Sequence, residues 1–253
     1  MSRLISCLWL LVLITCPVSS RAEHEQAPAA CAASEAFTTP EESLAQVAAA
    51  IAAGGPVNIL AVGSATTVGD QLGTDHNTAF PFRMVEALHA ALPKVAFALT
   101  LRGGRGMTAE DMLPLLEAAL VGQHYQLVIW QTGTVEAVRG MRPDGMVAAL
   151  QEGVDRARDA GADVVLIDPQ FSRFLRANAD LDPYEAALQQ VSAMPNVVLF
   201  RRFDVMRGWA EDGGIDLERA RQADRVRMMA LLNTCLGETL ARFVLNGAGV
   251  AAP

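Results

Sequence analysis

Five short and continuous apolar runs recur along the chain. They cover residues 57–62, 95–101, 126–131, 162–167 and 196–200. Strands that are covered on both faces have such continuous Val, Ile and Leu runs, whereas a half-exposed strand alternates apolar and polar positions. The segments between the runs have mainly helical periodicity. This alternation predicts the α/β class, with a doubly wound parallel sheet of five strands.

The helices between these strands are marked by their ends and by their apolar faces. Pro40, followed by two glutamates, opens a helix predicted over 41–53, because proline and acidic residues favour a helix start. Thr108 is a predicted N-cap that Asp111 completes as a capping-box-like pair. The predicted buried stripes are Phe82, Val85, Leu88 and Leu92 in helix 80–92, and Met112, Leu115, Leu116 and Ala119 after Thr108. Further helices are predicted over 143–160, 182–193 and 222–245, with a short one inside 201–214.

The N-terminus has the three parts of a secretory signal peptide. Arg3 supplies the positive start, residues 4–14 the apolar centre, and Ser20-Arg21-Ala22 a small-x-small cleavage site. The apolar centre is shorter than the roughly 20 residues that span a bilayer, which favours cleavage over a membrane anchor. Cys16 ends a weak lipoprotein-box-like pattern, so lipidation is a less favoured alternative.

These features divide the chain into three parts. The sequence predicts a signal peptide at 1–22, a polar and Ala-rich linker at 23–40, and one domain at 41–247. The protein is therefore expected to be periplasmic or secreted, with no stable membrane span after signal cleavage.

The net charge limits the kinds of partner that the protein is expected to bind, and the cysteines bear on the compartment in which it is expected to work. The formal net charge is −8, and loss of Arg3 and Arg21 with the signal peptide takes it to −10. The chain has no basic run, which excludes nucleic acid as an expected partner and leaves a small molecule or a glycan. Cys31 and Cys235 remain after cleavage. In an oxidising compartment they could form a disulfide, and two free thiols are an equally open alternative.

Loops that follow the strands of a parallel sheet are where ligands bind. The loop at 63–69 has no phosphate-binding pattern and no lysine, and the loop at 102–106 lacks the spacing of a dinucleotide site. The four histidines are too far apart in the sequence for a metal site. The sequence therefore predicts no cofactor and no metal. His76, close to the end of the first loop, is the one histidine considered for a site.

The order of these loops resembles the GDSL, or SGNH, hydrolase family of serine esterases. The first family block is G-D-S-x-[ST]-x-G, and Gly63, Thr67 and Gly69 match it in register. Ser64 stands at the aspartate position, and Ala65 stands at the position of the nucleophilic serine. The resemblance implies a three-layer α/β/α sandwich with a five-stranded parallel flavodoxin-like sheet.

The later family blocks show the same loss of chemistry. Gly106 matches the glycine whose N–H group helps to form the oxyanion hole, but Val135 stands where the family has its oxyanion asparagine. In the last block, D-x-x-H, Asp224 is retained and Arg227 replaces the histidine base. Without a nucleophile and a base, the covalent esterase route is not available. The resemblance thus indicates a catalytically inactive pseudo-hydrolase that binds an acylated or carbohydrate-type ligand.

Several alternatives stay open at the level of sequence. The protein could be an active carboxylic-ester hydrolase in which Ser64 replaces the serine and His76, oriented by Asp75, is the base. Glu136 could activate water, although a surface carboxylate is the plainer interpretation.

The arginines suggest two further roles. Arg227 and Asp224 could form an ion pair that fills or closes the emptied pocket. Alternatively, Arg102, Arg105 and Arg227 could bind an anionic group, because guanidinium groups match carboxylates and sulfates. A salt bridge without any ligand is at least as plausible from the sequence.

Overall fold

The computed structural model describes residues 31–69 and 78–250, and it contains a single five-stranded parallel sheet. The strands are β1 (Val57–Gly63), β2 (Phe97–Gly103), β3 (Leu127–Gln131), β4 (Asp163–Ile167) and β5 (Val197–Phe200). Their order in the sheet is β2-β1-β3-β4-β5, with every pair parallel. The predicted α/β class and five-stranded parallel sheet are confirmed.

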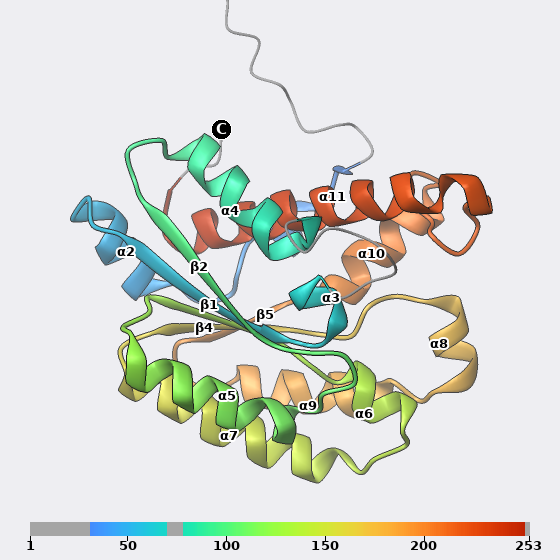
Figure 1. Cartoon of the computed structure of the whole chain (residues 1–253), viewed down its shortest axis with the longest axis horizontal. Helices are drawn as coiled ribbons and strands as arrows, with labels where there is room; N and C mark the ends of the chain where they lie inside the picture. Colours follow the sequence, from blue (N-terminus) through green and yellow to red (C-terminus); the bar gives the residue numbers. More distant parts are fainter. Residues whose placement is uncertain (1–30, 70–77, 251–253) are drawn as a thin grey trace, which may run out of the picture.

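Helices cover both faces of this sheet and complete the predicted sandwich (Figure 1). One layer holds α2 (Ala45–Ala52), α4 (Phe80–Ala91), α10 (Arg202–Glu211) and α11 (Arg225–Gly247). The other holds α5 (Ala109–Gly122), α7 (Pro143–Asp159) and α9 (Asp182–Ser192). The short helices α3 (Ala65–Val68), α6 (Thr134–Val138) and α8 (Arg173–Asn178) follow β1, β3 and β4 directly or after a short loop, and a 3-10 turn at Gln222–Asp224 precedes α11.

The inner strands β1, β3 and β4 have continuous apolar runs because both of their faces pack against helical layers, whereas the edge strand β2 is mostly half-buried or exposed. In β1, Ile59 and Ala61 belong to the core under α4 and α11. Leu60 and Val62, between and after them, belong to the core over α5 and α7. Each of these four side chains is fully buried. Alternate residues therefore enter different cores, and neither face can carry a polar stripe.

The first predicted helix begins later than its sequence indicates. The helix predicted over 41–53 starts at Ala45, and its first turn has no capping side chain of its own. The buried carboxylate of Asp163, at the start of β4, accepts hydrogen bonds from the N–H groups of Gln46 (2.9 Å) and Val47 (3.0 Å) instead. A cap supplied from a distant strand decides this helix start, which local sequence does not reveal.

The buried face of α4 also differs from the predicted stripe. Its buried residues are Phe80, Pro81, Met84 and Leu88, whereas the predicted Phe82 and Val85 are only half-buried. The face is set by α11, which packs along α4. In α5 the predicted capping box of Thr108 and Asp111 is present.

The described part of the predicted linker, residues 31–40, is packed against the domain. Cys31 forms a disulfide with Cys235 of α11, which resolves the two alternatives left open by the sequence. The indole Nε1 of Trp209 donates to the carbonyl of Ala32 (2.8 Å). A short helix, α1 (Glu35–Thr38), follows. This segment is therefore held to the domain covalently and by hydrogen bonds, which a free linker would not be.

Among the described residues, one helical stretch, residues 222–247, has the length and apolar composition of a membrane span. Of its most apolar window, 61% is buried inside the domain. It includes α11, whose apolar residues form the core with α4, so its hydrophobicity is explained by packing.

Candidate functional site

The ends of β1 and β2 lie against each other at the carboxyl edge of the sheet. Gly63 pairs with Gly103 in the register, and the N–H of Gly104 donates to the carbonyl of Gly63 (3.2 Å). A side chain at residue 103 would overlap the carbonyl oxygen of Gly63, and its φ of +120° is one that side chains rarely allow. This close approach sets the loop that holds Ala65 beside the loop that holds Gly106.

Gln131, the last residue of β3, ties the first loop to the sheet. Its side chain is 1% exposed. The amide oxygen accepts hydrogen bonds from the hydroxyls of Ser64 (2.9 Å) and Thr67 (3.1 Å) and from the N–H of Ser64 (3.2 Å). A weaker contact of 3.4 Å joins it to the hydroxyl of Thr66. The hydroxyl groups of this loop therefore serve to hold it in place.

The position of the family nucleophile has no reactive group. Ala65 is the first residue of α3, directly after β1, and is half-buried. Ser64 beside it is 8% exposed, and its hydroxyl donates to an amide oxygen, which is not a base. Ser64 is therefore poorly placed as a substitute nucleophile.

The two predicted oxyanion positions follow the two strands that flank β1, Gly106 after β2 and Val135 in α6 after β3. Gly106 has a φ of +74°, and its carbonyl accepts a hydrogen bond from the guanidinium of Arg139 (2.8 Å). Val135, in α6, is half-buried and has no side-chain donor. Of these two described positions, neither has a side chain that could donate to a developing oxyanion, so each offers only its main-chain N–H group.

Glu136 is a buried structural carboxylate, so its interpretation as a surface carboxylate was wrong. It is 2% exposed. Its Oε1 accepts from the N–H of Ala109 (2.6 Å) and the hydroxyl of Thr132 (2.9 Å), and its Oε2 accepts from the N–H of Gly133 (3.0 Å). Three donors occupy the carboxylate, so water activation by Glu136 is also not supported. It joins the start of α5 to the start of α6.

Asp224 and Arg227 do form the predicted ion pair, but outside any pocket. Their closest charged atoms are 3.7 Å apart, and Arg221 is the nearer partner of Asp224 at 2.7 Å. The side chain of Arg227 is 83% exposed. An exposed arginine cannot fill or close a buried site, so that hypothesis is wrong.

The histidines that the structure describes lie away from this edge. His89, near the end of α4, packs edge-on against Phe97 at the start of β2. The carbonyl of His124 accepts a hydrogen bond from Asn58, near the start of β1 (3.1 Å). Both therefore lie toward the amino edge of the sheet. His76 and Asp75 fall outside the described residues.

The three arginines considered for anion binding do not meet in a cavity of the described structure. Arg102 is exposed, and its guanidinium donates to the carbonyl of Leu101 (2.8 Å). Arg105 is exposed in the loop after β2, and Arg227 lies in the first turn of α11. None of them lines the apolar cavity at this edge of the sheet.

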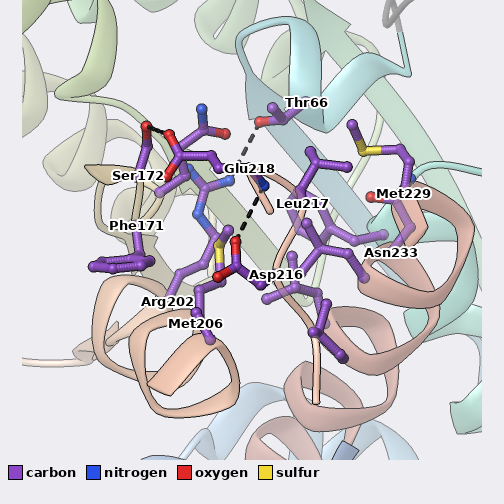
Figure 2. Close-up of a pocket in the computed structure, with 16 residues that line it drawn as sticks. Thr66, Phe171, Ser172, Arg202, Met206, Asp216, Leu217, Glu218, Met229 and Asn233 are labelled. Carbon is purple, nitrogen blue, oxygen red and sulfur yellow. Dashed lines mark hydrogen bonds between the residues drawn. The ribbon is translucent and has the colours of Figure 1, made fainter. Parts of the chain in front are cut away.

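That cavity has a volume of about 240 Å³ and lies between α3, α10, α11 and the segment before α11 (Figure 2). Its walls are mostly apolar, with Phe80, Met206, Ile215, Leu217, Leu232 and Leu236 among the lining residues. Thr66 and Arg202 supply polar groups at one wall, and the hydroxyl of Thr66 accepts a hydrogen bond from Arg202 (3.2 Å). The lining also includes five further polar or charged residues, which are Gln170, Ser172, Asp216, Glu218 and Asn233. A site that combines apolar walls with placed polar groups is typical of small-molecule binding.

Arg202 and Asp168 place two buried ionisable groups at this edge. Arg202 is 2% exposed, and burial lowers its pKa to about 10, a shift that the charge of Asp168 partly opposes. Burial raises the pKa of Asp168 to about 7, although the N–H of Phe203 and the charge of Arg202 act in the opposite direction. In the part of the chain that the structure describes, no group of three or more His, Cys, Asp or Glu residues could hold a metal ion.

Gln131, Asp168 and Arg202 are polar residues of this edge that the sequence motifs did not single out. All three stand at or just after the end of a buried strand: β3, β4 and β5 respectively. The carboxyl ends of neighbouring parallel strands share one edge, so the first polar residues at these ends must lie near one another. Their position at the carboxyl ends of predicted strands could therefore have identified these three residues as site candidates.

The sequence profile of the non-GDSL lipase-like family matches residues 30–250. A two-domain esterase active on acetylated mannans, co-crystallised with mannopentaose, has a similar structure with a TM-score of 0.62 at 14% identity, over 85% of this chain and 56% of that one. The sequence matches no curated protein.

Two further solved structures are matched over almost their whole length. Axe2, an acetylxylan esterase from Geobacillus stearothermophilus, gives a TM-score of 0.59 at 16% identity, over 78% of this chain and 97% of Axe2. TesA gives a TM-score of 0.53 at 19% identity, over 71% of this chain and 97% of TesA. At these identities the likeness establishes a shared fold.

Proposed function

The chain belongs to the non-GDSL lipase-like family, and from that membership we propose that it is a hydrolase-fold protein that binds an acylated or carbohydrate-type ligand without hydrolysing it. The resemblance to SGNH hydrolases is confirmed by the family match and by the esterase structures that share the fold. The loss of hydrolysis and the binding of a ligand are proposals.

The proposal depends on one observation: the loop after β1 has no side chain that could act as a nucleophile at the predicted position. The residue at the nucleophile position is Ala65, and the neighbouring hydroxyl of Ser64 is bound to the amide of Gln131. Acyl transfer by a serine enzyme needs a hydroxyl that a base can deprotonate. Neither described histidine lies at this edge, and the guanidinium of Arg227, at the predicted base position, has no hydrogen-bond acceptor.

The cavity beside α3 supports binding as the retained activity. It opens next to the loop that carries chemistry in the resembling family, and its wall is formed by a residue of that loop, Thr66. The predominance of aliphatic and methionine side chains favours an acyl group over a bare sugar as the part that enters. A sugar could then lie only at the outer, more polar rim.

We expect the purified protein to remain unlabelled by a fluorophosphonate probe and to release no p-nitrophenol from p-nitrophenyl acetate above the buffer rate. Mass spectrometry and absorbance measure these two results. Stoichiometric labelling that is lost in Ser64→Ala, and kept in the exposed-serine control Ser43→Ala, would contradict the proposal. It would support the rival function, an ester hydrolase, and His76→Ala would then test the base.

We also propose that the protein is exported. The sequence of residues 1–22 supports this, and the Cys31–Cys235 disulfide is typical of an oxidising compartment. The intact mass of protein expressed from the full-length chain should correspond to a chain that begins at Glu23. An uncleaved mass for the exported protein would contradict a signal peptide, and a mass that starts at a lipid-modified Cys16 would support the lipoprotein alternative.

A further inference from the structure

We infer that the cavity beside α3 takes a short-chain aliphatic carboxylate, a free acid and not its ester, with Arg202 as the group that binds the carboxylate. This inference goes beyond the proposed function, because a free acid belongs to a different ligand class from the acylated ligand proposed above, although both would enter the same cavity. It concerns a residue that no motif of the resembling family includes.

Arg202 has more N–H donors than hydrogen-bond partners among the described residues. A guanidinium carries five N–H donors. Among the described residues, one hydrogen bond engages one of these donors, from Nη1 to the hydroxyl of Thr66 (3.2 Å). The Nε atom is fully buried and has no partner. A buried donor without a partner is unfavourable, and a carboxylate can satisfy two donors of a guanidinium at once.

The guanidinium of Arg202 also has no close ion-pair partner among the described residues. No carboxylate of the described residues lies within 4.0 Å of the guanidinium of Arg202. Asp168 acts on it at longer range, and the hydrogen bond recorded for its carboxylate comes from the N–H of Phe203 (2.9 Å). The positive charge is therefore available to an anion that reaches the cavity wall.

The two carboxylates that line the cavity are already engaged elsewhere. Asp216 pairs with Arg173 (2.7 Å). Glu218 accepts from the hydroxyl of Ser172 (2.7 Å) and from the N–H groups of Arg173 (2.8 Å) and Phe174 (3.1 Å). Among the described residues that line the cavity, Arg202 is then the cation with a buried donor that has no partner.

The volume of the cavity and its apolar lining residues indicate the length and character of the ligand's aliphatic tail. A volume of about 240 Å³ is about eight times the ~30 Å³ share of one water molecule in the liquid. It thus accepts a chain about the length of hexanoate. The side chains of Met206, Leu232 and Leu236 line the cavity and match an unbranched aliphatic tail.

Sodium hexanoate and hexan-1-ol are the probes for this inference, with isothermal titration calorimetry as the measurement. The wild-type protein should bind hexanoate at least about tenfold more tightly than hexan-1-ol, because the alcohol cannot replace a charge-assisted pair of hydrogen bonds. Arg202→Met should weaken hexanoate binding by at least about tenfold and leave hexan-1-ol binding within about threefold.

The matched control is Arg201→Met. Arg201 is the neighbouring residue, is exposed, pairs with Asp204 and does not line the cavity. This variant should bind hexanoate as the wild type does. If Arg202→Met does not fold, the double variant Arg202→Met/Asp168→Asn removes both buried charges and takes its place.

Equal affinity of the wild type for hexanoate and hexan-1-ol, or undiminished hexanoate binding by a folded Arg202→Met, would overturn the inference. Neither of these binding results would contradict the proposal that the protein does not hydrolyse esters. Conversely, ester hydrolysis together with Arg202-dependent hexanoate binding would contradict the proposed function and leave this inference standing, so the two failures are distinguishable.

Discussion

Replacement of both Cys31 and Cys235 by alanine is expected to lower the free energy of unfolding by about 3–5 kcal/mol. The bridge joins residues that are 204 positions apart. Such a link removes a large part of the chain entropy of the unfolded state, and the size of the effect grows with the length of the closed loop. Urea unfolding monitored by tryptophan fluorescence measures the change.

The reduced wild-type protein is the matched control for this double variant. It should unfold at the same urea concentration as the variant, and reducing agent should have no effect on the variant itself. In both, residues 31–40 should become sensitive to proteolysis, because only contacts such as that of Trp209 with Ala32 still hold them. Equal stability of the oxidised wild type and the variant would contradict a stabilising disulfide.

Asp168→Asn is expected to remove a pH dependence of stability that the wild type has between about pH 4 and pH 7. The pKa of Asp168 is about 7 in the folded protein and 3.8 ordinarily. Between these values the folded state holds a proton that the unfolded state has released. Stability therefore falls as the pH rises through this window, and it becomes constant above it.

The size of this effect follows from the shift. Each pKa unit corresponds to about 1.4 kcal/mol, so the wild type should lose up to about 4 kcal/mol relative to Asp168→Asn across the window. The asparagine amide keeps an oxygen for the N–H of Phe203, which donates to Asp168 in the wild type. The environment that sets this pKa also includes the charges of Arg202, Glu185 and Asp204.

Urea unfolding at four pH values from 4.5 to 7.5 checks this second prediction. Other titrating groups contribute equally to both proteins, so the difference between their free energies of unfolding isolates Asp168. Asp144→Asn, at an exposed position in the first turn of α7, should follow the wild type at every pH. A constant difference between wild type and Asp168→Asn would contradict the raised pKa.

The candidate site illustrates how far residue identity alone can lead. The side chains of Ala65 and Val135 cannot act as a nucleophile or an oxyanion donor in any fold, so the sequence alone showed that these two positions lack those groups. The role of Glu136 was not, because a carboxylate in a loop has the same appearance whether it is exposed or holds three buried donors. Likewise, the ion pair of Arg227 with Asp224 was predicted correctly, while its exposure was not.

The sequence by itself determined the chain order of the five strands and the longer helices, the parallel sheet, and the alanine at the position that the family resemblance assigns to the nucleophile. These depend on local periodicity and on the identity of single residues. Tertiary structure alone decided that Cys31 pairs with Cys235, that Asp163 caps α2, and that Arg202 reaches Thr66 beside an apolar cavity. These contacts join residues more than 100 positions apart, and burial and hydrogen bonding between such residues depend on packing that no local pattern encodes.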